Sequence, residues 1–156
     1  MPRQEDQHGY RHGAASRTAV ITAIDTNVLL DVFGADPKFA PLSSEAIRSC
    51  LREGRLVASE VVWAEAATVF GDVARFRDAM DKLAASFSPM TEQAAVKASE
   101  AWRRYQAGGG RRDRIAADFL IGAHAQVVAD RLLTRDRGFY RRYFAGLQVL
   151  DPSADR

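Results

Sequence analysis

Residues 18–33 read TAVITAIDTNVLLDVF, and this stretch decides the fold class. Its first half, Thr18 to Ile24, is rich in Thr, Val and Ile and too short for a helix, which favours a buried strand. The strand ends at Asp25. The next residues are typical of helix starts, and Val28 begins an apolar run with helical spacing. A strand, an acid and the start of a helix therefore follow one another within sixteen residues.

The same alternation continues along the chain. Glycines and prolines separate short apolar segments from longer ones with helical periodicity. We expect a helix capped by Ser43 or Ser44, one capped by Ser59 and ended by Gly71, and one from Asp72 whose apolar stripe reaches Phe87. The expected strands are residues 56–58, 87–88, 132–134 and 147–150, and the other expected helices are 91–105, 114–130 and 138–144.

Short strands between helices predict an α/β fold, with a central, mostly parallel sheet covered on both faces. Functional residues in such sheets lie beyond the carboxyl ends of the strands. We expect one domain over residues 18–152, after a flexible N-terminal arm at 1–17 and before a short tail at 153–156.

Composition narrows the class of protein. The chain of 156 residues has one cysteine, Cys50, so it has no disulfide framework and no multi-cysteine zinc site. It has no apolar run long enough to cross a bilayer and no secretory signal, so we expect no membrane association and a cytoplasmic location.

Charge is unevenly distributed. The net charge is only +2, yet residues 111–142 contain eight arginines and four aspartates, a local excess of four positive charges. This region could attract a polyanion, or it could be an ordinary solvated face.

Four acids occupy chemically informative positions. Asp25 and Asp136 follow predicted strands, whereas Glu65 and Asp118 interrupt apolar helical segments. Because acids are rarely buried without partners, we expect all four to converge at one edge of the sheet. Such a cluster must keep protons or hold a cation, and carboxylate oxygens suit Mg²⁺ or Mn²⁺. The alternative, in which each acid caps a helix or forms a surface ion pair, remains open at this stage.

The four segments that carry these acids resemble the signature of PIN-domain nucleases, in the same order and with similar spacing. They are Ile24–Leu30, the helix with Glu65, Asp118 followed by Phe-Leu-Ile-Gly-Ala, and Leu133–Phe139. The resemblance runs from about Ala19 to Leu150 and is greatest to VapC-type toxins. It implies a PIN-like three-layer α/β/α sandwich.

The resemblance also implies an endoribonuclease that uses Mg²⁺ or Mn²⁺ held by Asp25, Glu65, Asp118 and Asp136. Thr134 fits the hydroxyl position that orients water, and Asn27 would support Asp25. Phosphate contacts are expected from the arginines that flank the acids, namely Arg112, Arg114, Arg135 and Arg137.

Expected partners are an RNA substrate, a cognate antitoxin protein and a second copy of the chain in a homodimer. Two alternatives remain open: a non-catalytic PIN-like module that binds RNA or protein, and a metal-dependent nuclease that acts on DNA.

Overall fold

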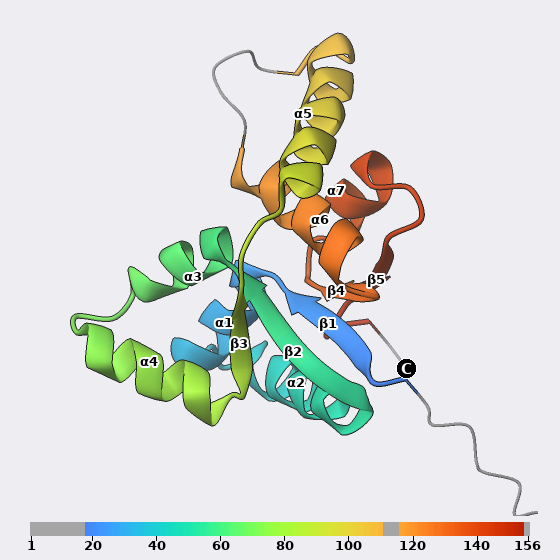
Figure 1. Cartoon of the computed structure of the whole chain (residues 1–156). Coiled ribbons are helices and arrows are strands. Elements are labelled where there is room, and N and C mark those ends of the chain that lie inside the picture. The colour runs from blue at the N-terminus through green and yellow to red at the C-terminus, as the bar shows by residue number, and fades with distance from the viewer. Residues whose placement is uncertain (1–17, 111–115, 155–156) are drawn as a thin grey trace, which may run out of the picture.

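A five-stranded, wholly parallel sheet forms the centre of the molecule in the computed structural model, which describes residues 18–110 and 116–154 (Figure 1). The strand order is β3-β2-β1-β4-β5, so β1 lies in the middle of the sheet. The strands are β1 (Val20–Ile24), β2 (Gly54–Ser59), β3 (Ala85–Ser88), β4 (Arg131–Leu133) and β5 (Gln148–Leu150). The α/β class and the parallel sheet that the sequence predicts are confirmed.

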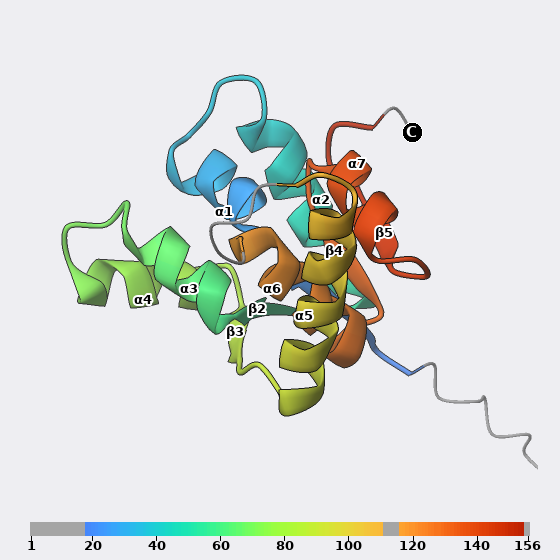
Figure 2. The same ribbon diagram turned by 90° about the horizontal axis from the view of Figure 1, so that it is seen from above.

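Helices cover both faces of this sheet, as a parallel sheet requires. One layer starts with α1 (Thr26–Phe33) and α2 (Ala40–Glu53), and α3 (Glu60–Ala67) and α4 (Val73–Lys82) extend it beside β2 and β3. The other layer contains α5 (Glu92–Ala107), α6 (Ala117–Val128) and α7 (Arg137–Tyr143). Figure 1 shows this second layer above the sheet, and Figure 2 shows α5 and α6 lying over the strands when the molecule is seen from above. The three-layer α/β/α sandwich is therefore confirmed.

Close packing fixes the sheet and the second layer. Gly54 starts β2 opposite Val20, and a Cβ atom at Gly54 would lie 1.9 Å from the Val20 carbonyl oxygen. Gly122 of α6 lies against the ring of Phe144, where a Cβ atom would approach to 2.4 Å. A side chain at Gly54 would force the Val20 backbone to shift, and one at Gly122 would force the Phe144 ring to move.

Most helix starts agree with the sequence. The side chains of Ser59, Asp72 and Thr91 each accept a hydrogen bond from a backbone N–H in the first turn of α3, α4 and α5. These residues satisfy N–H groups that would otherwise lack partners, which is why the chain enters a helix at each of them.

Three expectations about where helices begin or end are wrong. The helix expected at Ser43 or Ser44 begins at Ala40, because Pro41 suits a first helical turn and Ser43 is buried, where its hydroxyl donates to Asp31 at 2.7 Å. The helix α3 ends at Ala67, four residues before Gly71.

The third error is the apolar helical stripe expected to reach Phe87, because α4 already ends at Lys82. Phe87 lies instead in β3, as the expected strand at 87–88 had it, and is 52 % exposed. Its ring packs edge-on against Trp63 with the centroids 5.4 Å apart.

No helix in the described residues has the length and apolar character needed to span a membrane.

Candidate active site

Asp25 lies at the carboxyl end of the central strand β1 and is 3 % exposed. Its backbone N–H donates to the Leu133 carbonyl of β4 at 2.9 Å, which fixes it to the neighbouring strand. Its Oδ1 atom accepts from the backbone N–H of Thr26 at 2.7 Å and caps α1. The capping role considered for Asp25 is therefore real, but it uses only one of the two carboxylate oxygens.

The other oxygen, Oδ2, accepts three side-chain hydrogen bonds. The donors are the Thr134 hydroxyl at 2.7 Å, the Tyr140 hydroxyl at 3.0 Å and the Asn27 amide at 3.2 Å. Hydrogen bonds to a charged acceptor are stronger than neutral ones, so this set orients the carboxylate firmly. The expected support of Asp25 by Asn27 agrees with this geometry.

Thr134, directly after β4, is the centre of this network and is fully buried. Its hydroxyl oxygen accepts from the backbone N–H of Asp136 at 3.0 Å and from the Asn27 amide at 3.3 Å. A hydroxyl has a single hydrogen, and in Thr134 this hydrogen is directed at Asp25. Thr134 thus fixes two of the acids relative to each other.

Glu65 and Asp118 approach the same edge from the two helical layers. Glu65 lies on α3, where it is exposed and accepts from the Thr26 hydroxyl at 3.4 Å. Its side chain is therefore less enclosed than its apolar sequence neighbours suggest. Asp118 is in the first turn of α6 and partly buried, and α6 packs against α3 at this end.

The acids influence one another electrostatically. Burial raises the pKa of Asp118 to about 6, and the negative charges of Asp25, Asp136 and Glu65 add to this rise. Burial also raises the pKa of Asp25 and of Glu65, although hydrogen bonds from Thr134 and from Thr26 oppose this. Four carboxylates from four elements therefore share one region of negative potential.

This donor set fits a divalent cation in its chemistry. All four groups are carboxylates, the ligands that Mg²⁺ and Mn²⁺ prefer. A cation would offset the mutual repulsion that, after burial, adds to the rise in the pKa of Asp118. Across residues 18–110 and 116–154, no three His, Cys, Asp or Glu side chains already converge as a finished metal site. Side-chain rotation, most easily that of the exposed Glu65, would have to bring the ligands together.

Comparison with known protein families identifies the fold. The family model described as PIN domain matches residues 22–145, which include all four acids. The chain belongs to the PIN-domain family.

Solved structures share the PIN fold of this chain. VapBC-1 from nontypeable Haemophilus influenzae aligns with a TM-score of 0.66 at 22% identity, over 86% of this chain and 99% of that one. VapBC2 from Rickettsia felis, bound to a DNA fragment from its promoter, gives 0.66 at 15% identity, over 84% and 98%. A toxin–antitoxin complex from Klebsiella pneumoniae gives 0.61 at 21% identity, over 86% and 99%. A comparison with curated proteins gives no match.

The arginines predicted to bind phosphate have different surroundings in this PIN domain. Arg135 donates two hydrogen bonds to the buried Asp31, at 2.9 and 3.0 Å, and its guanidinium lies 4.2 Å from the centre of the Phe39 ring. Arg137 pairs with Asp151 at 3.0 Å. Arg112 and Arg114 lie outside the described residues. The phosphate-binding role of all four stays a prediction.

Sequence reasoning missed two polar residues of this region. Tyr140 is completely buried in α7, yet its hydroxyl reaches Asp25. Asp31 is 4 % exposed and joins α1 to Arg135 and to Ser43 of α2. Asp31 offered a signal, because an acid on the apolar face of a short helix needs a partner, whereas Tyr140 resembles any other aromatic core residue.

Proposed function

We propose that this PIN domain is an endoribonuclease dependent on Mg²⁺ or Mn²⁺ and the toxin of a toxin–antitoxin pair. The observation that carries the proposal is the electrostatic coupling of Asp118 to Asp25, Asp136 and Glu65, which come from four separate elements. Like charges around an acid disfavour its charged form, and a divalent cation bound among them would offset this cost.

Asp25, Glu65, Asp118 and Asp136 would hold the ion. Such an ion supplies charge neutralisation for a phosphodiester and makes water a better nucleophile at neutral pH. The oxygen of water attacks phosphorus, the bond to the 3′ oxygen breaks, and the products are a 3′-hydroxyl and a 5′-phosphate. Thr134, Asn27 and Tyr140 keep Asp25 in a single orientation throughout.

The test is cleavage of a panel of RNAs by the purified protein with Mg²⁺ or Mn²⁺, beside Glu65→Gln and Asp118→Asn variants. Asp81→Asn, an exposed acid on α4 away from the site, is the matched control. We expect both site variants and excess chelator to abolish cleavage while the control retains it. Cleavage that persists in Asp118→Asn or in chelator would overturn the proposal.

Substrate class needs its own comparison. RNA, single-stranded DNA and flap DNA are offered to the same preparation, and we expect cleavage of RNA alone. Preferential cleavage of DNA would favour the alternative nuclease, and tight RNA binding without cleavage would favour the non-catalytic module.

Partner proteins follow from the same proposal. We expect an antitoxin that places a cationic side chain against the acids, since an arginine pairs well with carboxylates, and a homodimer of the PIN domain. Co-expression with the product of an adjacent small reading frame should inhibit cleavage. Light scattering of the isolated protein should give twice the 17.2 kDa chain mass. A monomer, or an adjacent product that leaves cleavage unchanged, would contradict these two expectations.

A further inference from the structure

A cleft of about 320 Å³ lies between α5 and α7, in the same helical layer as Asp118. It is separate from the acidic edge, and none of the four acids lines it. Its lining comes from α5, the end of α6, α7 and the turn after α7: Lys97, Glu100, Arg104, Gln126, Arg142, Tyr143, Phe144 and Ala145.

Three cations line this cleft against one carboxylate, that of Glu100. Within the described part of the chain, no ion pair joins Lys97, Arg104 or Arg142 to a carboxylate. Some basic side chains outside the cleft do pair with acids, such as Arg135 with Asp31 and Arg137 with Asp151. Arg48, Arg52, Lys82 and Arg131 are paired as well, whereas others, such as Arg75 and Arg77 on α4, pair with no described carboxylate. Among the described residues, the cleft therefore carries two more positive than negative charges.

Hydrogen bonds hold the walls of the cleft in place. The Arg104 guanidinium donates to the Tyr143 carbonyl at 2.7 Å and so ties α5 to α7. The Gln126 amide donates to the Ala145 carbonyl at 3.0 Å and ties α6 to the turn that follows α7. The Arg142 guanidinium lies 5.4 Å from the centre of the Tyr143 ring. The Arg104 guanidinium has five N–H donors, so its bond to the Tyr143 carbonyl leaves most of them for a ligand.

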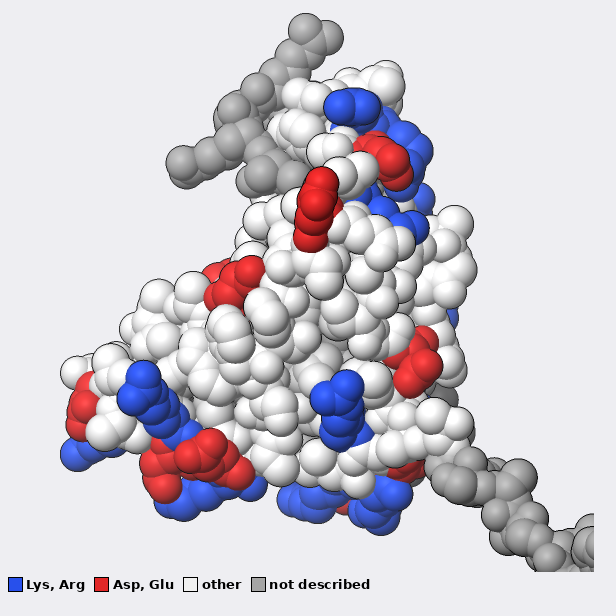
Figure 3. All heavy atoms as spheres, viewed as in Figure 1, with Lys and Arg blue, Asp and Glu red and all other residues white. Residues whose placement is uncertain are grey.

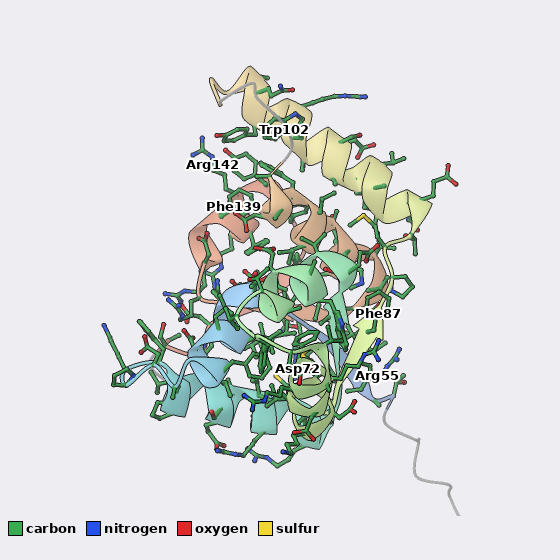
Figure 4. All side chains as sticks on the ribbon, turned by 90° about the vertical axis from the view of Figure 1, so that its left-hand side faces the viewer. Arg55, Asp72, Phe87, Trp102, Phe139 and Arg142 are labelled. Carbon is green, nitrogen blue, oxygen red and sulfur yellow. The ribbon has the colours of Figure 1, made fainter. Side chains whose placement is uncertain are left out.

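The cleft lies within reach of a chain that occupies the acidic edge. The helix α7 begins directly after Asp136, and Arg142 is six residues further along, a rise of about 9 Å. Figure 3 shows basic side chains gathered over α5, at the top of that view. In Figure 4, Arg142 lies on the side of the molecule formed by α5 and α7, well away from Asp72 at the start of α4.

We propose that this cleft binds a backbone phosphate of the RNA, further along the strand from the phosphodiester that is cut. The inference rests on the proposed function, because it assumes that RNA occupies the acidic edge. Arginine recognises phosphate through paired, charge-assisted hydrogen bonds, and two arginines with a lysine supply them here. Arg135 and Arg137 are held by acids, so Arg104 and Arg142 are freer than these two to bind phosphate.

The test measures RNA binding rather than cleavage. A fluorescent oligouridylate is titrated with Asp118→Asn protein, which is not expected to cut it, over a series of salt concentrations. Each phosphate contact to single-stranded RNA contributes about 0.7 to the slope of log K against log salt. We expect Arg104→Gln/Arg142→Gln to weaken binding and to reduce the slope by about 1.4, that is, two such contacts.

Matched variants make the result specific. Arg75→Gln/Arg77→Gln removes two exposed charges from α4 and should leave the slope unchanged. Arg142→Gln alone spares the Arg104 bond to Tyr143 and should reduce the slope by about 0.7. Glu100→Gln should strengthen binding, because it removes the one carboxylate that lines the cleft.

Equal slopes in the cleft variants and the α4 variants would overturn the inference. Two other results would also overturn it. In one, the cleft variants bind RNA normally but lose binding to an acidic protein partner. In the other, inorganic phosphate binds the cleft as tightly as RNA does. Cleavage by the parent protein is scored separately. If the parent cleaves RNA but the cleft variants keep the parent's salt slope, only the phosphate-binding role of the cleft is refuted. If the parent does not cleave RNA but the cleft variants have a smaller slope, only the nuclease function is refuted.

Discussion

The Tyr140 hydroxyl donates a hydrogen bond to Oδ2 of Asp25 at 3.0 Å, and both residues are buried. Burial and the charge of Asp25 raise the pKa of Tyr140, so its hydroxyl keeps its proton and acts only as a donor. The last helix of the fold thereby fixes an acid that follows the first strand.

Replacing this donor tests its contribution. Tyr140→Phe keeps the ring and removes the hydroxyl, and a hydrogen bond to a charged group contributes about 1.5–3 kcal/mol. We expect RNA cleavage to fall by about tenfold or more, with weaker Mn²⁺ binding by calorimetry. Asp81→Asn on α4 is again the control, because Asp81 is exposed and lines neither the acidic edge nor the cleft. Equal activity and Mn²⁺ affinity in both variants would show that Tyr140 only fills space.

Thr134 allows a sharper test, because two replacements of similar size differ in the hydroxyl. Thr134→Val removes the bond to Asp25 and the acceptor of the Asp136 N–H, and leaves polar groups without partners at a cost of about 1–3 kcal/mol each. We expect lower activity and a lower melting temperature. Thr134→Ser, which keeps the hydroxyl, should restore most of both. Failure of Ser to outperform Val would contradict the role of the hydroxyl.

The raised pKa of Asp118 predicts that the stability of the protein depends on pH. Its pKa in the folded protein is about 6, above the ordinary value of 3.8, so the stability it contributes is complete below pH 3.8 and is lost as pH rises through 6. In metal-free buffer at pH 7.5, Asp118→Asn should be more stable than the parent by roughly 1–2 kcal/mol, allowing for solvent screening of a half-buried group. Urea unfolding should show this difference shrinking as pH falls from 6 to 4. A less stable variant at pH 7.5 would contradict the electrostatic origin of the shift.

The pair formed by Asp31 and Arg135 should matter for stability more than any surface ion pair. Asp31→Asn leaves the Arg135 guanidinium without its charged partner in a part-buried site, and we expect a loss of roughly 2–3 kcal/mol. Glu45→Gln breaks the exposed pairs with Arg48 and Arg52 and should change stability by less than about 1 kcal/mol. Urea denaturation midpoints compare the two. Equal midpoints would mean that solvent screens the Asp31 pair as well.

The sequence determined the order of the elements, the parallel sheet and the family. Strand and helix periodicity, and capping residues such as Ser59 and Thr91, act over a few residues, so they can be interpreted without coordinates. It also identified the four acids, since Asp25 and Asp136 follow strands and Asp118 interrupts an apolar helix. Local pattern misjudged Ser43, because its burial against Asp31 depends on how α1 packs against α2.

Only the tertiary structure decided which group each polar side chain meets. Two of the residues that orient Asp25, Thr134 and Tyr140, are 109 and 115 positions away in the chain. The same holds for Arg135, which pairs with an acid 104 residues distant, and for the cations that α5 and α7 bring together in one cleft. Hydrogen bonds and ion pairs require contact within a few ångströms, and only the packing of the helical layers onto the sheet brings such distant residues that close.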